Sequence, residues 1–170
     1  MDSNVLVIGE THGHLKSIMA EAELVRSFKP EFVLHEGFVD YSKGEIEKFV
    51  DDCLNLNRSN ELIQKYLPLL QAIKESGAVI EGCDDRTQQA LWDDCEDITS
   101  EDYSRGVDHV LQKAERLREV LKNREEYMVS RIAQYSKMGR ILAIIGVAHL
   151  QRVVEALQEK GIEVESIFLE

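Results

Sequence analysis

Two turns of the sequence pair a glycine with a histidine at the same spacing, a pattern that can hold a reactive imidazole. Gly9 precedes His12 by three residues, and Gly146 precedes His149 by three residues. Glycine permits a sharp turn at the end of a strand, so the histidine near the start of the next helix can face back across a crevice. Imidazole is a base near neutral pH and a common metal ligand. A histidine that only caps its helix is the alternative.

Carboxylates lie in or near comparable turns. Glu10 lies inside the first turn, Glu36 ends an apolar run and Asp85 follows another. Carboxylates that share one site raise one another's pKa unless a cation is present. Their crowding therefore indicates either a metal ion or a compensating arginine.

The two histidines and one of these carboxylates form a suitable ligand set for zinc, manganese or cobalt, with one position left for water. We expect His12, Glu36 and His149 to hold such a divalent ion. Glu10 is expected to act as the general base that activates the attacking water.

His35 and Glu36 are adjacent in an apolar run, so their side chains face opposite sides of a strand. Only one of them can enter the site without a bulge. Glu36 is the better candidate because it lies nearer the strand end, and because a carboxylate buried without a partner is costly. His35 is expected to be a hydrogen-bonded core histidine.

A basic residue interrupts the apolar stripe of a long helical segment. Arg124 lies in the middle of that stripe, where an apolar side chain belongs. A guanidinium on a core-facing position needs an acidic or ligand partner, so we expect Arg124 to stabilise a developing oxyanion. A structural ion pair or an arginine at the edge of the stripe is the alternative. The remaining stripe residues are Leu117, Leu121, Met128, Ile132 and Tyr135.

A further set of turn residues is expected to contact a small-molecule or peptide substrate. For His14 the alternative is an orientation toward solvent, and for Arg86 it is an ion pair within its own loop. The expected substrate-binding residues are Gly9, His14, Asp85, Arg86 and Gly146.

Short, nearly continuous apolar runs predict the strands that must position these residues. Such runs are typical of strands covered on both faces, and they alternate with helical patterns. We therefore predict a single α/β domain over residues 1–170, with about five largely parallel strands and helices on both faces. Ligands bind beyond the carboxyl ends of such strands, where the candidate residues gather. The predicted strands are 4–8, 32–36, 78–81, 140–145 and 162–168.

The helical patterns fit between these strands. A capping box from Ser42 to Glu45 predicts the start of one helix, and Pro68 is expected to kink or restart another. The segment 100–138 reads as helix almost throughout, which as one rod would span roughly 58 Å. We predict a break near Asn123. The alternative is a projecting arm that suits a partner, such as a second copy in a homodimer. The other predicted helices are 14–28, 59–75 and 150–160.

Composition excludes several classes of function. The chain has 170 residues and a net charge of −12, which argues against a nucleic-acid partner. No apolar run is long enough to span a membrane, and the first residues lack the pattern of a signal peptide, so we expect a cytoplasmic protein. Cys53, Cys83 and Cys95 lack the spacing of a zinc site and are expected to be reduced.

The ordered set of motifs resembles the superfamily of TraB, Tiki, ChaN and erythromycin-esterase proteins. That superfamily is marked by two GxxH motifs, an acidic residue after the second strand and an arginine-containing helix. The matching residues are Gly9–His12, His35–Gly37, Asp85–Arg86, Arg124–Met128 and Gly146–His149.

The resemblance implies more than one chemistry. Tiki-like members are metal-dependent peptidases, and the paired GxxH histidines with the glutamate would be their metal-site residues. Erythromycin esterases are hydrolases that use histidine and glutamate without a metal. ChaN-like members bind haem. Membrane-linked roles of other members are not expected for this chain.

The first hypothesis is therefore a metal-dependent hydrolase that cleaves a peptide, amide or ester bond. A non-catalytic haem- or metal-binding module is an alternative. A calcineurin-like phosphoesterase is another, because Gly9–Gly13 (GETHG) resembles a GDxHG motif. That class requires an aspartate in place of Glu10 and later GD and GNH motifs, which this chain lacks.

Overall fold

A parallel sheet forms the centre of the computed structural model, which describes residues 3–11, 14–38, 48, 50–53, 61–93 and 98–169, with only the backbone of 61–64. The strand order is β3-β2-β4-β1-β5, and every pairing is parallel. The predicted α/β fold with a five-stranded sheet is confirmed. The strands are β1 (Val5–Glu10), β2 (Phe32–His35), β3 (Val79–Gly82), β4 (Ile141–Gly146) and β5 (Glu165–Leu169).

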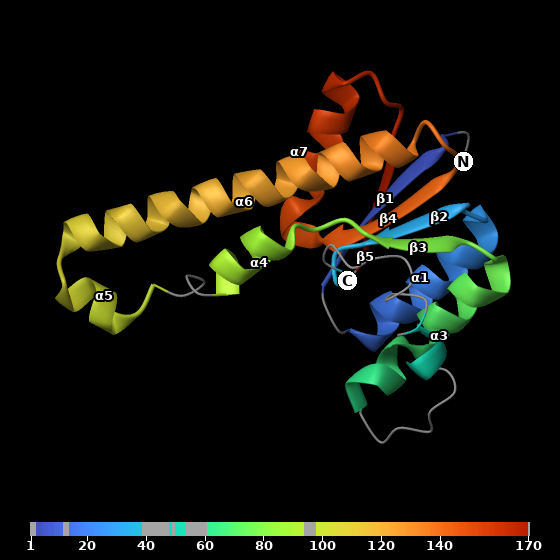
Figure 1. Cartoon of the computed structure of the whole chain (residues 1–170), viewed down its shortest axis with the longest axis horizontal. Coiled ribbons are helices and arrows are strands. Elements are labelled where there is room, and N and C mark those ends of the chain that lie inside the picture. The colour runs from blue at the N-terminus through green and yellow to red at the C-terminus, as the bar shows by residue number, and fades with distance from the viewer. Residues whose placement is uncertain are drawn as a thin grey trace.

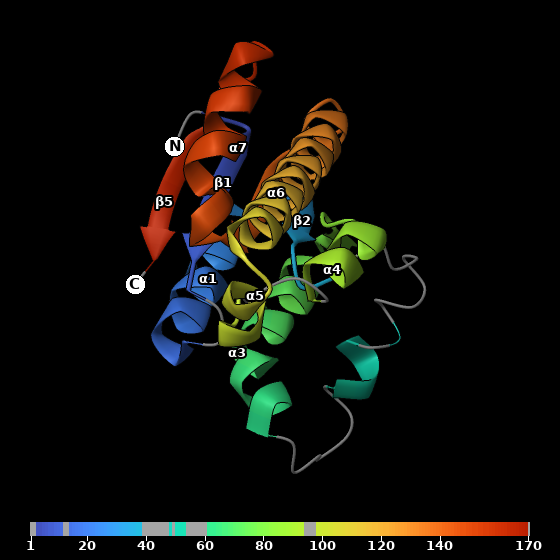
Figure 2. The ribbon, with the colours of Figure 1, turned by 90° about the vertical axis from the view of Figure 1, so that its left-hand side faces the viewer.

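Helices cover both faces of the sheet (Figures 1 and 2). One apolar core lies between the sheet and α1 and α3, and a second lies between the sheet and α6 and α7. Alternate side chains of β1 enter the two cores: Leu6 and Ile8 enter the first, and Val5 and Val7 enter the second. The helices are α1 (Leu15–Phe28), α3 (Glu61–Ser76), α4 (Arg86–Asp93), α5 (Ser100–Ser104), α6 (Val107–Tyr135) and α7 (Val147–Glu159).

The chain reverses its winding direction beside β4. β1 leads into α1 on one face, whereas the neighbouring β4 leads into α7 on the other face. Glu10, the last residue of β1, lies in register with Gly146, the last residue of β4. Helices that leave adjacent strands toward opposite faces open a crevice at the carboxyl ends of those strands, where parallel sheets bind ligands.

The predicted break near Asn123 is wrong, because α6 is one helix from Val107 to Tyr135. Its 29 residues span about 44 Å. The chain instead turns at Gly106, whose φ of 106° lies in the region that favours glycine. As a result α5 and the first half of α6 project from the sheet as an arm (Figure 1).

The remaining predictions concern Pro68, the capping box at Ser42, the cysteines and membrane-spanning helices. α3 continues through Pro68 and does not restart there. The capping box at Ser42 lies outside the described residues. Cys53 and Cys83 are buried thiols, whereas Cys95 lies outside the described residues. In the part of the chain that the structure describes, no helix is both long enough and apolar enough to cross a membrane.

Candidate functional site

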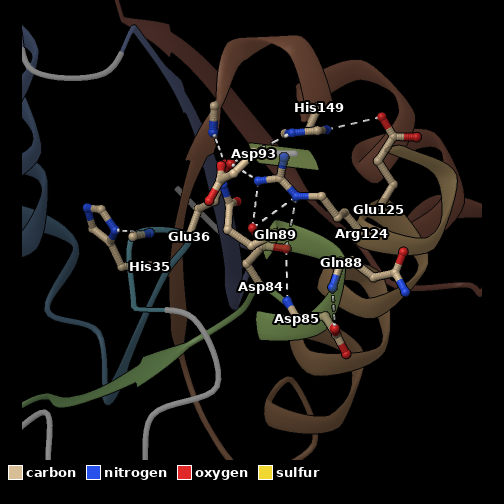
Figure 3. Close-up of polar contacts among 12 residues, drawn as sticks. His35, Glu36, Asp84, Asp85, Gln88, Gln89, Asp93, Arg124, Glu125 and His149 are labelled. Atoms are coloured by element: carbon tan, nitrogen blue, oxygen red, sulfur yellow. Dashed lines mark hydrogen bonds and ion pairs between the residues drawn. The ribbon is translucent and has the colours of Figure 1, made fainter. Parts of the chain in front are cut away.

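A buried arginine at the carboxyl ends of the strands binds two carboxylates (Figure 3). Nε of Arg124 donates to both carboxylate oxygens of Asp84, at 3.1 and 3.0 Å. Nη2 donates to Asp84 Oδ2 at 2.6 Å and to Glu36 Oε1 at 2.7 Å. Trp92 lies beside the guanidinium, with its ring centroid 5.8 Å from Cζ. The acidic partners expected for Arg124 are therefore present, in the form of a buried ion pair.

Strand alternation explains why Glu36 reaches this arginine. In β2, Val33 packs in the α1–α3 core and Leu34 packs in the α6–α7 core. Glu36 therefore points toward α6 and α7, and His35 points the other way. Nδ1 of His35 accepts a hydrogen bond from the backbone N–H of Gly37 at 2.9 Å, as expected for a core histidine.

The second oxygen of Glu36 ties β2 to the start of α7. Glu36 Oε2 accepts a hydrogen bond from the backbone N–H of Gly146, the N-cap residue of α7. The positive end of the helix dipole favours a carboxylate at this position. Both oxygens of Glu36 therefore have a hydrogen-bond donor.

His149 lies in the first turn of α7, between two carboxylates (Figure 3). Its Nδ1 is 3.2 Å from Glu125 Oε1, and its Nε2 is 3.7 Å from Glu36 Oε1. Arg152 reaches the other oxygen of Glu125 at 3.4 Å. In the tautomer in which Nδ1–H donates to Glu125, Nε2 is the atom that can accept a proton or bind a metal.

Burial and ion pairing act in opposite directions on the pKa values of Asp84 and Arg124. These two residues belong to the strand-end cluster, which comprises Glu36, Asp84, Arg124, Glu125 and His149. Burial raises the pKa of Asp84 above its ordinary 3.8, and nearby Glu36 adds to the rise. Hydrogen bonds and charge from Arg124 oppose that rise. Burial lowers the pKa of Arg124, but the hydrogen bonds to Asp84 and the charges of Asp84, Glu36 and Asp93 together outweigh burial and raise it overall. The guanidinium is therefore a permanent positive charge within the cluster.

Glu10 does not join the strand-end cluster. Its side chain is buried, but it shares the strand face of Leu6 and Ile8, which pack in the α1–α3 core. The cluster lies on the opposite face, under α6 and α7. The sheet therefore separates the expected general base from His149.

Four of the expected substrate-binding residues, His14, Asp85, Arg86 and Gly146, lie at the starts of helices. His14 is the exposed N-cap residue of α1, without a side-chain capping hydrogen bond. Asp85 accepts a hydrogen bond from the backbone N–H of Gln88 at 2.8 Å and thereby caps α4. Arg86, the first residue of α4, is exposed.

The two glycines of the turns have distinct structural roles. A Cβ atom on Gly9 would lie 2.7 Å from Cδ2 of Leu150, so glycine allows α7 to pack closely on β1. Gly146 caps α7 and supplies the N–H that binds Glu36.

The described residues supply only part of a metal site. His12 lies outside them, and no group of three His, Cys, Asp or Glu side chains within the described ranges is arranged to hold a metal ion. His149 Nε2 and Glu36 Oε1 are two candidate ligand atoms, but Glu36 already binds Arg124. The described residues alone therefore do not fit a divalent ion.

Sequence reasoning missed Asp84 and Glu125. Glu125 follows Leu121 by four residues and precedes Met128 by three, so helical periodicity places it in the buried stripe. Asp84 directly follows buried Cys83 at the end of β3, one residue before the predicted Asp85.

No protein-family model, curated protein or solved structure matches this chain. The resemblance to the TraB, Tiki, ChaN and erythromycin-esterase superfamily therefore stays a prediction from the motifs.

Proposed function

We propose that this protein is a hydrolase that cleaves a peptide, amide or ester bond at the strand-end cluster. One observation carries the proposal: Nδ1 of His149 is held by Glu125, while Nε2 faces Glu36 in the first turn of α7. A histidine oriented by a carboxylate is an arrangement used in general-base catalysis. Its place at the carboxyl ends of parallel strands agrees with where such sheets bind ligands.

In the proposed reaction, Nε2 of His149 takes a proton from a water molecule as the water oxygen bonds to the carbonyl carbon. The bond from that carbon to the leaving nitrogen or oxygen then breaks, and the imidazolium returns the proton to the leaving group. Backbone N–H groups in the first turn of α7 have no partner within the helix and can stabilise the oxyanion. Arg124 donates a hydrogen bond to Glu36 beside the imidazole.

A divalent ion would give a metal-dependent form of the same reaction. Manganese, cobalt or zinc would need His12 as a third ligand beside His149 and Glu36, and would activate a bound water. Since Glu36 already binds Arg124, the proposed proton transfers involve this chain's own residues only.

The test is hydrolysis of a panel of chromogenic esters and peptide amides by the full chain. We expect His149→Asn to lower kcat/KM by roughly a hundredfold or more. His109→Asn is the matched control, because His109 also contacts a carboxylate but lies on the arm. Equal activity of His149→Asn and the wild type would contradict the proposal.

Elemental analysis of the purified protein and assays with EDTA and added manganese separate the metal-free from the metal-dependent form. A Soret shift on haemin titration, without hydrolysis, would favour the haem-binding alternative.

A further inference from the structure

The strand-end cluster is buried, although the proposed reaction requires a substrate to reach it. None of its five residues is more than 8% exposed, and Asp84 is fully buried. A peptide, amide or ester cannot contact His149 while every surrounding element stays in place. The proposed reaction therefore requires one of the elements that cover the cluster to move.

α4 is the least firmly packed of the three described helices around the cluster. No residue of α4 is buried, whereas α6 buries seven residues and α7 buries three. Moving α6 or α7 would expose apolar core side chains such as Met128 and Leu157. α4 is held instead by half-buried side chains, among them Leu91 and Trp92. Elements with few buried apolar contacts open most easily.

α4 packs on α6 and lies over the guanidinium of Arg124, with Gln89 and Asp93 beside that group (Figure 3). The ring of Trp92 is 5.8 Å from Cζ of Arg124. Asn123 of α6 donates a hydrogen bond to Gln88 of α4, at a long distance of 3.4 Å. α4 therefore covers the cluster on the side of Arg124 through weak contacts.

The residues before α4 provide a fixed point for its movement. Cys83 and Asp84 are fully buried, and both carboxylate oxygens of Asp84 accept from Arg124. Asp85 is only half-buried, and its carboxylate caps α4. α4 can therefore pivot after Asp84 without breaking the ion pair beneath it.

Arg124 retains a hydrogen-bond donor that the described residues do not use. A guanidinium has five N–H groups, and the bonds of Arg124 to Asp84 and Glu36 come from Nε and Nη2. Nη1 donates to no residue that the structure describes. A substrate oxygen that reaches the guanidinium can therefore accept a hydrogen bond from Nη1.

We propose that α4 is a lid over the strand-end cluster, which pivots after Asp84 to admit the substrate and closes over it during hydrolysis. Opening removes Trp92 from the guanidinium and gives a substrate carbonyl access to Arg124. The need for a lid rests on the proposed function, but the motion of α4 can be measured without a substrate.

A reversible cross-link between α4 and α6 tests the lid. Gln88→Cys and Asn123→Cys, in a Cys95→Ser background, place two thiols where the amide side chains now meet. A short bis-methanethiosulfonate reagent joins the thiols, and dithiothreitol releases them. Arg26→Cys with Glu75→Cys is the matched control, because that exposed ion pair joins α1 to α3 on the other face of the sheet. Circular dichroism checks that the variants are folded.

Acrylamide quenching of Trp92, the only tryptophan in the chain, reports the motion without a substrate. We expect the cross-link between α4 and α6 to lower the quenching constant, because it prevents the opening that exposes the indole. Hydrogen exchange should slow in α4 and not in β4, and dithiothreitol should reverse both changes. Quenching and exchange that the cross-link leaves unchanged would overturn the lid, whether or not the protein is a hydrolase.

Hydrolysis of the best substrate of the panel is the second measurement. The cross-link between α4 and α6 should lower kcat/KM by at least roughly tenfold, and dithiothreitol should restore it. The control cross-link should leave kcat/KM unchanged. Equal activity of the cross-linked and reduced enzymes would overturn the lid and leave the hydrolase in place. A wild type without hydrolytic activity would contradict the proposed function, and the quenching result would still decide whether α4 opens.

Discussion

Two clusters in this protein combine carboxylates, a basic side chain and a histidine, and they differ in how the chain assembles them. The strand-end cluster joins Arg124 to residues 40 and 88 positions earlier. The arm cluster, comprising Thr99, Asp102, His109 and Lys113, is local. Asp102 binds Lys113 at 2.8 Å and His109 at 3.0 Å, within 11 residues of sequence.

The same residue types have opposite electrostatic outcomes in these clusters. Burial raises the pKa of Asp84 despite its arginine. Hydrogen bonds lower the pKa of Asp102, with the bond from Lys113 contributing most and the backbone N–H of Thr99 next. Position in the fold, more than amino-acid composition, therefore separates the candidate functional site from the local contacts between α5 and α6.

The largest expected effect comes from removing the central cation of the strand-end cluster. Arg124→Met leaves two buried carboxylates without a counterion and should lower the free energy of unfolding by about 3–5 kcal/mol. Urea denaturation measures the loss. Arg118→Met, an exposed change on the same helix, should stay within about 0.5 kcal/mol of the wild type. Adding Glu36→Gln and Asp84→Asn to Arg124→Met should recover stability, and no recovery would contradict the charge argument.

The second-largest expected effect is on catalytic activity, which should depend on the strand-end cluster and not on the arm cluster. Glu125→Gln frees Nδ1 of His149 and should lower kcat roughly tenfold to a hundredfold with little change in KM. Asp102→Asn removes a comparable histidine partner on the arm and should leave kcat unchanged. Steady-state kinetics on the best substrate of the panel makes the comparison, and equal losses in both variants would remove the distinction.

The pH dependence of stability should differ in sign between the two aspartates. The pKa of Asp84 is raised in the folded state, so its contribution is fully present below 3.8 and is lost as pH rises through the folded value. The pKa of Asp102 is lowered, so its contribution is present above 3.8 and is lost as pH falls toward the folded value.

Urea midpoints measured from neutral pH to below 3.8 test these signs. Asp84→Asn should lose stability more steeply on acidification than the wild type, and Asp102→Asn less steeply. Parallel curves for all three proteins would show that neither carboxyl changes its pKa on folding.

The smallest effect should come from the capping box of the arm cluster. Thr99 Oγ1 accepts from the backbone N–H of Asp102, and the Asp102 carboxylate accepts from the backbone N–H of Thr99. Thr99→Ala should cost about 1 kcal/mol, confined to the arm. Hydrogen exchange should rise in α5 and not in β4.

Parallel strand direction made much of the strand-end cluster predictable from the sequence. Apolar runs that end in glycine placed Glu36 and His149 at the carboxyl ends of the strands. The apolar stripe that Arg124 interrupts placed this arginine against them. The contact between Glu125 and His149 was harder to predict from the sequence, because it depends on how α6 packs on α7.

Glu10 shows why the rest could not be predicted. β1 continues through Gly9 to Glu10, two residues beyond the predicted strand, so pleating rather than turn geometry sets the direction of this side chain. The unbroken α6 has a different cause. Asn123 is only a modest helix former, but its low propensity does not interrupt α6, and the chain turns instead at Gly106, the N-cap residue of α6.

One consequence of the unbroken α6 is mechanical. Val107 at the tip of the arm and Arg124 at the sheet belong to one stiff rod, separated along its axis by roughly 26 Å. Glu125 is the next residue along that rod. A force that tilts the tip of the arm would therefore displace the Arg124 guanidinium and the Glu125 carboxylate together. The arm is thus mechanically coupled to both groups.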